Sequence, residues 1–529
     1  MTRAGAVIWI AFFAVGCART RHDPAKASPM TAGDVVDTTS GKVAGTRQDG
    51  VLAFKGIPFA KPPVGELRWR PPEPAAAWSD VKPATAFPPP CAQNDPTHGT
   101  RGSEDCLALN VWTKPSATPR PVLFFLHGGG NVFGSTSEVT AGVPLYDGAR
   151  IAQRHDVVVV TAQYRLGVFG FFAHDKLSAE NERRSSGNYG LLDQIAALRW
   201  VKENIARFGG DPNHVLLFGE SAGGVDTCAL LATPLAAGLF SSALIQSGGC
   251  STIPAARAKS WQQSFVNASL CGEDAACWRR LGTEAALKAS ASEAIVGGVV
   301  QTPSGPVVDG WVLADTPLAR MKAGKHNHVP IVFGANRDET GSPLFHVPHI
   351  FPTFTYEARV KAIFGVDGAA KILAAYPASA FASPRAAWIA LTSDGQFICP
   401  ARAYARAAAA NQTERVYRYL YTQVSEGGRI AASAGAAHGF ELFYVFQWIS
   451  ATPGYVATPG DLALERNIGG YWTRFAKTGD PNGDGAVPWP AYEVEKDPYL
   501  ELGTPTRAAD KLATARCDLW DTFYEQQRW

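Results

Sequence analysis

The chain has 529 residues, of which 46% are hydrophobic, so it is long enough to bury a large core. Its formal net charge is +2, and the 18% of residues that are charged carry both signs along the chain. This balance argues against a protein that binds nucleic acid or another polyanion. The length allows two or three domains, but no linker, charge block or internal repeat divides the chain. A single domain is therefore predicted over residues 35–529.

The first residues form a targeting segment. Arg3 supplies a positive charge, and residues 4–15 are an apolar run that is too short to span a bilayer as a mature helix. We therefore expect the mature protein to leave the cytoplasm.

The end of the targeting segment has two interpretations. The AVGC sequence that ends at Cys17 resembles a bacterial lipobox, although leucine is more usual at the place of Ala14. We predict a lipoprotein-type signal peptide over residues 1–17, lipidation of Cys17 and a flexible tether over residues 18–34. Simple cleavage after Ala18 is the alternative. The first case predicts a periplasmic or outer-membrane-anchored lipoprotein, and the second a secreted protein.

A strand that is buried on both faces is predicted at residues 122–127, because the run is apolar almost throughout. It ends in the HGGG sequence at 127–130. Glycines there leave backbone N–H groups pointing into a pocket without side chains in the way.

Strand and helix then alternate. Residues 157–161 predict another buried strand, and residues 189–208 predict a helix with apolar residues on or near one face. This alternation predicts a mostly parallel, doubly wound sheet.

The GESAG sequence at 219–223 follows the apolar, β-branched run at 215–217 and precedes a helical stretch. This is the context of a nucleophile elbow, in which the serine backbone is strained at a sharp turn. Gly219 and Gly223 let strand and helix approach closely, while Ser221 stands clear at the tip.

Either glycine motif alone is a common turn. Together, about 90 residues apart and each after a buried strand, they indicate acyl-transfer chemistry. Ser221 is then the candidate nucleophile, and the backbone N–H groups of Gly129, Gly130 and Ala222 form the candidate oxyanion hole.

The nine cysteines agree with an oxidising compartment. The close pairs 91/106 and 271/277 suggest small closed loops, although sequence alone cannot give connectivity. Cys228 lies in the apolar run after the elbow, and we expect it to be a buried free thiol.

Nine stretches in this order resemble the type B carboxylesterases. This branch of the α/β-hydrolases includes cholinesterases and bacterial para-nitrobenzyl esterases. The SEDCLALN stretch is the most specific of them. The stretches are GIPFA (56–60), PPVG (62–65), SEDCLALNV (103–111), YRLG (164–167), GLLDQ (190–194), GESAG (219–223), ANRDE (335–339), HGFEL (438–442) and FAKTGDP (475–481).

The resemblance implies an α/β-hydrolase fold: a mostly parallel, doubly wound central sheet with an N-terminal β extension and helical insertions. It also implies a serine carboxylesterase that acts through an acyl-enzyme. We expect small to medium aryl or alkyl esters as substrates, because the segments at 250–300 and 340–400, which should wall the pocket, are rich in aromatic residues.

The resemblance supplies the two partners of Ser221. Glu339 matches the acid of the family and His438 its base, in the chain order typical of α/β-hydrolases. The residues alone leave other assignments open, since Asp338 is adjacent to Glu339. Glu441 is a further candidate to orient His438, but its proximity in sequence favours a local cap or pair.

Other positions match the family as pocket or structure. Glu220 is expected to line the pocket beside the nucleophile, and Ser247 to lie behind the acid. Disulfides are implied for Cys91–Cys106, Cys271–Cys277 and Cys399–Cys517. Buried ion pairs are implied for Arg68–Glu104 and Arg165–Asp193.

Two departures from the family pattern matter. No aromatic residue lies between Cys91 and Cys106, where cholinesterases carry a tryptophan that binds quaternary ammonium, and this counts against choline esters. Asp226 stands where the family often has serine, and a carboxylate there is expected near the site without an evident role.

No cofactor or metal is expected. Residues 480–485 imitate half of a calcium-binding loop, but position twelve is Ala491 rather than glutamate. Competing functions are hydrolysis of amides, carbamates or polyester fragments with the same residues, and a non-catalytic cholinesterase-like binding protein. The intact Ser221, Glu339 and His438 count against the last. The oligomeric state is left open.

Overall fold

The computed structural model describes residues 34–290, 294–296, 298–301, 304–425, 433–483 and 485–525. The predicted signal peptide and the lipidation site Cys17 lie outside the described residues, as does the predicted tether except for its last residue. That residue, Asp34, is buried and accepts hydrogen bonds from Arg47. Among the residues described, no helix is both long and apolar enough to cross a membrane.

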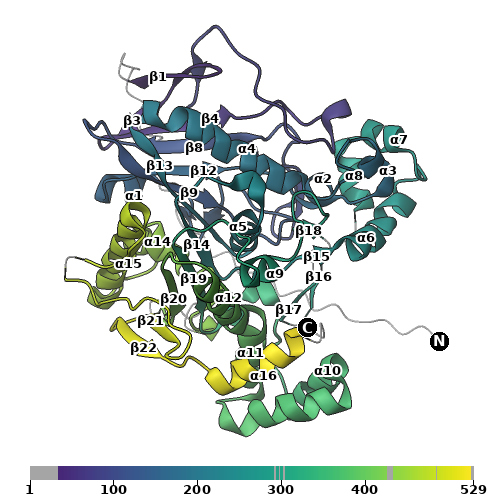
Figure 1. Cartoon of the computed structure of the whole chain (residues 1–529), viewed down its shortest axis with the longest axis vertical. Helices are drawn as coiled ribbons and strands as arrows, with labels where there is room; N and C mark the ends of the chain where they lie inside the picture. The colour runs from purple at the N-terminus through teal and green to yellow at the C-terminus, as the bar shows by residue number, and fades with distance from the viewer. Residues whose placement is uncertain are drawn as a thin grey trace.

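An 11-stranded sheet forms the centre of the molecule (Figure 1). In spatial order its strands are β22 (Arg507–Asp510), β21 (Pro498–Leu502), β20 (Val416–Tyr421), β19 (Ile331–Asn336), β14 (Ser242–Gln246), β13 (Gly210–Glu220), β9 (Arg120–Leu126), β12 (Val158–Ala162), β8 (Ala108–Thr113), β4 (Val51–Pro58) and β3 (Thr46–Gln48). The strands from β21 to β12 are parallel, and the outer strands β22, β8, β4 and β3 pair antiparallel. The predicted mostly parallel α/β sheet is confirmed.

Helices cover both faces of this sheet. On one face lie α4 (Tyr189–Asn204), α5 (Ala222–Ala232) and α12 (Cys399–Asn411), and on the other lie α1 (Ala149–Arg154), α14 (Leu442–Val445) and α15 (Pro459–Thr478). Alternate residues of β13 serve the two layers: Val215 and Leu217 pack with the first, Leu216 and Phe218 with the second. Because successive strand residues point to opposite faces, a strand covered on both sides must be apolar throughout.

The predicted elements are found with small shifts of their ends. The helix predicted at 189–208 is α4 followed by a 3₁₀ turn, Ile205–Phe208, and it stops at Gly209, which has a φ of 78°. The strands predicted at 122–127 and 157–161 are β9 and β12.

The predicted N-terminal β extension is present as a three-stranded sheet, and helices are inserted after β14 and after β19. The extension consists of β1 (Val35–Thr38), β2 (Gly41–Ala44) and β5 (Lys82–Pro83). The inserted helices are α6 (Ala255–Ala268), α7 (Ala275–Arg280), α8 (Thr283–Ala289), α9 (Pro317–Lys322), α10 (Thr353–Ala375) and α11 (Pro384–Ser393). Shorter helices are α2 (Gly167–Phe171) and α3 (Asp175–Ala179), and the last helix is α16 (Thr514–Glu525).

The remaining strands form short two-stranded ribbons outside the central sheet. They are β6 (Gln93–Asp95) with β7 (Gly99–Arg101), β10 (Val139–Thr140) with β11 (Val143–Pro144), β15 (Ile253–Pro254) with β18 (Val307–Val308), and β16 (Ala294–Val296) with β17 (Val299–Gln301).

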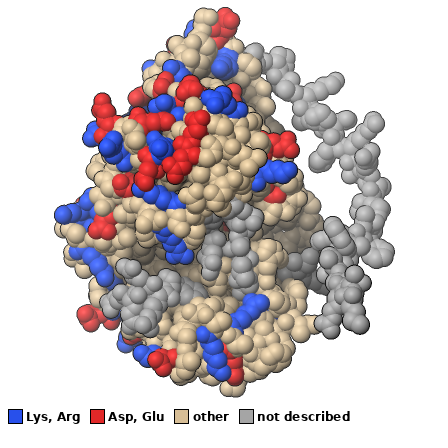
Figure 2. Space-filling model, turned by 90° about the vertical axis from the view of Figure 1, so that its right-hand side faces the viewer, with Lys and Arg blue, Asp and Glu red and all other residues tan. Residues whose placement is uncertain are grey.

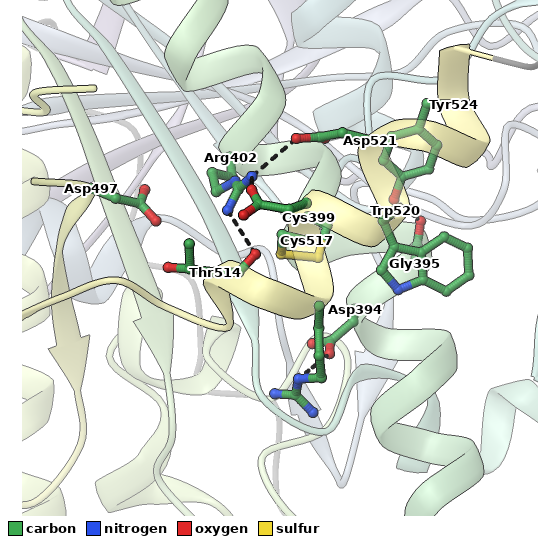
Figure 3. Close-up of a disulfide and its surroundings, with 12 residues drawn as sticks. Asp394, Gly395, Cys399, Arg402, Asp497, Thr514, Cys517, Trp520, Asp521 and Tyr524 are labelled. Atoms are coloured by element: carbon green, nitrogen blue, oxygen red, sulfur yellow. Dashed lines mark hydrogen bonds and ion pairs between the residues drawn. A yellow bond between two sulfur atoms is a disulfide. The ribbon is translucent and has the colours of Figure 1, made fainter. Parts of the chain in front are cut away.

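The three disulfides implied by the resemblance are present: Cys91–Cys106, Cys271–Cys277 and Cys399–Cys517. The last one links α12 to α16, as Figure 3 shows. Beside it, the Arg402 guanidinium donates to the Thr514 carbonyl and the Asp521 carboxylate, so hydrogen bonds and an ion pair join the two helices in addition to the disulfide.

The prediction that Cys228 is a free thiol was wrong. Cys228 is bonded to Cys250, which ties α5 to the loop that follows β14. Both cysteines are buried, as expected of Cys228 from its apolar run. An apolar run indicates that a cysteine is buried, but it does not indicate whether that cysteine is bonded. No sequence pattern links Cys228 to Cys250, which lies 22 residues away.

Both implied ion pairs are found, each with two parallel hydrogen bonds between buried groups. Arg68 bonds Glu104 at 2.7 and 2.6 Å, and Arg165 bonds Asp193 at 2.8 and 2.7 Å. On the outside, Figure 2 shows lysine and arginine side chains lying among aspartate and glutamate side chains, in keeping with the small net charge.

Candidate active site

Ser221 sits at the sharp turn between β13 and α5. Its backbone has φ 57° and ψ −121°, which is strained for a residue with a side chain. The flanking glycines make this turn possible: a Cβ on Gly219 would lie 2.4 Å from the Gly223 oxygen, and one on Gly223 would lie 2.0 Å from the Leu126 oxygen. Ser221 is partly exposed, whereas its neighbours Glu220 and Ala222 are buried. The predicted elbow is therefore formed.

The HGGG loop follows β9 and lies against this turn. A Cβ on Gly128 would lie 2.7 Å from Glu220 Oε2 and 3.0 Å from Ser221 Cβ. Gly129 has a φ of 108°, and a Cβ there would lie 2.1 Å from the Phe133 oxygen, so only glycine fits. Gly129 and Gly130 are partly exposed, like Ser221. The structure thus brings the predicted glycine loop and Ser221 together.

The start of the HGGG loop is held by Tyr164. Its hydroxyl donates to the His127 carbonyl at 2.7 Å, and the two rings stack with centroids 4.5 Å apart. Burial lowers the pKa of His127 to about 4, so this imidazole is neutral at ordinary pH and serves the packing of the loop.

Glu339 and His438 are in direct contact. Glu339 Oε2 lies 2.5 Å from His438 Nδ1, and the His438 backbone N–H donates to the Glu339 carbonyl. Glu339 Oε1 accepts from the backbone N–H of Asn336, at the carboxyl end of β19. Both side chains are buried. A histidine whose Nδ1 is held by a carboxylate has its Nε2 available for proton transfer.

The alternative acid, Asp338, points elsewhere. It accepts hydrogen bonds from the Ala436 backbone N–H and from Arg337, and thereby braces the loop that leads to His438.

Glu441 does not cap or pair locally, contrary to expectation. Its Oε1 accepts from Gln246 on β14 and its Oε2 from Asn336 on β19. These partners are far away in sequence, which is why local spacing gave the wrong prediction. Glu441 therefore links the loop of His438 to the sheet beneath it.

A second carboxylate faces the other side of the imidazole. Glu220 Oε1 lies 3.2 Å from His438 Nε2. Burial raises the pKa of Glu220, and the nearby Glu441 and Glu339 carboxyl groups add to the rise. Burial lowers the pKa of His438, but the Glu220 and Glu339 carboxylates outweigh it and raise that pKa above its usual value. Glu220 and His438 therefore each shift the pKa of the other.

Ser247 lies in the loop after β14, and its backbone N–H donates to the Gly334 carbonyl of β19. Its hydroxyl is buried and makes no hydrogen bond with any described residue. Its expected place behind the acid stays a prediction.

Two phenylalanines flank the imidazole. Phe345 meets the His438 ring edge-on at 5.3 Å between centroids, and Phe397 lies at 5.1 Å. Other aromatic residues of the segments at 250–300 and 340–400 lie elsewhere: Phe265 and Trp388 belong to the core, and Phe354 is 74% exposed.

The sequence did not predict that Phe397 lies beside His438. Phe397 sits in a single π-helical turn, Asp394–Ile398, which no sequence pattern predicts. Figure 3 shows this turn against α16, where the Tyr524 hydroxyl donates to the Gly395 carbonyl. The Asp394 carboxylate accepts from Tyr376 and pairs with Arg516 at 3.2 Å.

The calcium-like segment is an ordinary turn as far as the structure describes it. The Asp480 carboxylate accepts from the Asn482 backbone and side-chain N–H groups, and it pairs with Arg415. Asp484 lies outside the described residues.

Comparison with known proteins agrees with this geometry. The model of the carboxylesterase family matches residues 32–520. The para-nitrobenzyl esterase of Bacillus subtilis (strain 168) is 37% identical over 485 residues, which cover 88% of this chain and 94% of that protein. The fumonisin B1 esterase of Sphingopyxis macrogoltabida is 36% identical over 495 residues, which cover 90% and 88%.

A solved structure of PNB esterase superimposes with a TM-score of 0.79 at 34% identity, covering 92% of this chain and 99% of that one. The fold is therefore that of the α/β-hydrolases. The chain belongs to the carboxylesterase family and is a serine-type carboxylic ester hydrolase.

Proposed function

We propose that Ser221, Glu339 and His438 are the catalytic residues of this esterase. The supporting observation is the 2.5 Å contact between Glu339 and His438. The same imidazole lies 3.2 Å from Glu220, which is the residue before the strained Ser221. His438 Nε2 takes the proton of the Ser221 hydroxyl as its oxygen bonds the ester carbonyl carbon. Glu339 holds the imidazole in the required tautomer and stabilises its positive charge.

The tetrahedral intermediate carries its negative charge on the former carbonyl oxygen. The N–H groups of Gly129, Gly130 and Ala222 receive this oxygen, and one such donor is worth about 3 kcal/mol. The carbon–oxygen bond to the alcohol then breaks, and His438 Nε2 gives its proton to the departing alcohol. Water next attacks the acyl-enzyme while His438 takes its proton, and Ser221 leaves with that proton as the acid is released.

Small to medium aryl and alkyl esters are the substrates we propose. Phe345 and Phe397 lie against the His438 ring, and such apolar neighbours favour apolar groups next to the reacting carbonyl. The Cys91–Cys106 loop carries no aromatic residue to bind a quaternary ammonium. Names of relatives, which include a pyrethroid hydrolase of Rattus norvegicus, indicate that ester preference varies in this family.

The test is hydrolysis of para-nitrophenyl acetate, butyrate and octanoate by the wild type and by Ser221→Ala. We expect turnover by the wild type, about 10⁴-fold less or none by the variant, and an organophosphate adduct on Ser221. Ser241→Ala is the matched control, since that hydroxyl donates to the carbonyl of Val215 in the middle of β13. A Ser221→Ala variant with full activity, or a folded wild type that hydrolyses no ester and takes no label, would contradict the proposal.

We also propose that the protein is exported and lipidated at Cys17, on the strength of the apolar run and the lipobox-like sequence. The mass of the mature N-terminus after expression in a Gram-negative host tests this. A diacylglycerol adduct on Cys17 that is lost in Cys17→Ser supports lipidation. An unmodified chain that begins at Arg19 supports simple cleavage and secretion.

A further inference from the structure

Asp226 is a carboxyl group without a cationic partner in the part of the chain that the structure describes. It is fully buried on α5, and burial raises its pKa to about 7. Two neutral amides bond this carboxyl group: Asn131 Nδ2 donates to Oδ1 at 2.9 Å, and Gln194 Nε2 donates to Oδ2 at 2.6 Å. Burying a carboxyl group without a cation lowers the free energy of unfolding.

Asn131 is the residue that ends the glycine run. Its φ is 62°, a left-handed conformation that costs a residue with a side chain about 1 kcal/mol, although asparagine tolerates it best. Two bonds hold it there: the side chain bonds Asp226, and the carbonyl accepts from the Gly167 N–H at 2.7 Å. With Tyr164 on His127, the loop that carries Gly129 and Gly130 is therefore fixed at both ends.

Asp226 also sits on the helix that begins at Ala222. The two residues are four apart, so they lie on the same side of α5. Gln194 braces the carboxyl group from α4. The Asp226 carboxyl group thus connects α5, which begins at the expected oxyanion donor Ala222, to the loop that carries the other two expected donors, Gly129 and Gly130.

We propose that Asp226 is a positioning residue: it ties the start of α5 to the glycine loop through Asn131, and so sets the spacing between the N–H groups of Ala222, Gly129 and Gly130. The inference rests on the proposed function, because that is where these donors are assigned to the oxyanion. Asp226 touches neither substrate nor the reacting serine, and its effect on the reaction is exerted through Asn131.

The first test compares two variants at position 226. Asp226→Ala removes the tie, and we expect kcat to fall about 10- to 100-fold with KM changed by less than about threefold. Asp226→Asn is the conservative variant, and we expect it to recover most of this loss. Its amide oxygen still accepts from Asn131, and its NH₂ group can donate to Gln194 Oε1, which is buried and bonds no described residue.

The second test removes the other end of the bond. Asn131→Gly deletes the side chain but keeps the left-handed backbone, which glycine adopts without strain. We expect it to lower kcat about as much as Asp226→Ala, and the double variant to be no worse than either single one. Losses that multiply in the double variant would overturn the proposal, because Asp226 would then act by another route.

A transition-state analogue separates positioning from mere packing. A trifluoromethyl ketone bonds the serine oxygen and places an oxyanion among the donors, so its Ki in Asp226→Ala is expected to rise in proportion to the fall in kcat/KM. The matched control is Asn204→Ala, which removes a buried amide from the far end of α4, where its side chain bonds Thr39. It is expected to lower the thermal midpoint and leave kcat unchanged.

The outcomes also distinguish this inference from the proposed function. If Ser221→Ala is inactive while Asp226→Ala equals the wild type in kcat and in Ki, only the positioning role fails. If Ser221→Ala retains full activity, the proposed function is wrong. The assignment of the oxyanion donors, on which the role of Asp226 depends, is then wrong as well.

Discussion

Glu220 Oε1 lies 3.2 Å from His438 Nε2, on the side of the imidazole opposite Glu339. The residue before the proposed nucleophile is thus an electrostatic neighbour of the proposed base. A carboxylate there favours the protonated imidazole, so it opposes the neutral form that must accept the serine proton.

This contact predicts a pH effect. The raised pKa of His438 places the acid limb of kcat/KM at a higher pH than an ordinary imidazole would give. Glu220→Gln removes the negative charge, so the pKa of His438 falls and the limb moves to lower pH by about one unit. A pH profile with para-nitrophenyl butyrate measures this. Glu284→Gln, on the exposed start of α8, is the control, and a limb that stays in place or moves upward contradicts the explanation.

Two adjacent carboxylates provide a matched pair for the assignment of the acid. Glu339→Gln is expected to lower kcat about 10³- to 10⁴-fold, because the amide no longer stabilises the imidazolium or fixes its tautomer. Asp338→Asn changes a carboxylate that bonds Ala436 and Arg337, and should keep kcat within about threefold. Steady-state kinetics of both variants decides the matter. The reverse order of effects would make Asp338 the acid.

The walls of the site predict a change in chain-length preference. Phe397→Ala removes a ring that lies 5.1 Å from the His438 ring, so the ratio of kcat/KM for octanoate to that for acetate should rise about tenfold. Phe354→Ala serves as the control, since that ring is 74% exposed. An unchanged ratio in Phe397→Ala would place the acyl chain on another wall.

The disulfides should differ in their contribution to stability. In the chain-entropy model, closing the 22-residue separation of Cys228–Cys250 is worth about 3 kcal/mol, and the 6-residue separation of Cys271–Cys277 about 2 kcal/mol. Replacing both cysteines of a pair by alanine should therefore lower the thermal midpoint more for Cys228–Cys250, which is also buried. Calorimetry under one set of conditions measures the order, and equal or inverted losses count against it.

Asp226 predicts a dependence of stability on pH. Its pKa is about 7 in the folded chain and near 3.8 when exposed, so between these values the folded state holds a proton that the unfolded state releases. Stability from this group therefore falls as pH rises from about 4 to about 7. Asp226→Asn removes the slope, and its thermal midpoint relative to the wild type should rise over that range and then level off. Parallel melting profiles from pH 4.5 to 8 would show that Asp226 does not titrate there.

Sequence reasoning succeeded where the chemistry depends on residues close together in the chain. The Gly-x-Ser-x-Gly turn and the HGGG loop each lie within a few residues of a strand end. Their glycines therefore predicted the sharp turn at Ser221 and the glycine loop beside it. The contact between Glu339 and His438 spans 99 residues, and only the resemblance to a family supplied it.

Two physical causes account for the failures. Asp226 meets Asn131 across 95 residues, and Cys228 meets Cys250 across a strand and a loop, so neither contact leaves a periodic signal. Phe397 reaches His438 from a π-helical turn, whose extra residue breaks the helical period on which a sequence argument depends.

The wide spacing of Ser221, Glu339 and His438 has a consequence during synthesis. The nascent chain holds a complete set of these residues only after His438 has emerged, and β20, which pairs with β19, still lacks its second parallel neighbour until β21 is made at residues 498–502. The link from Cys399 closes later again, at Cys517. The proposed catalytic set is therefore incomplete for most of translation, and under this assignment esters in the cell meet no active site until nearly the whole domain exists.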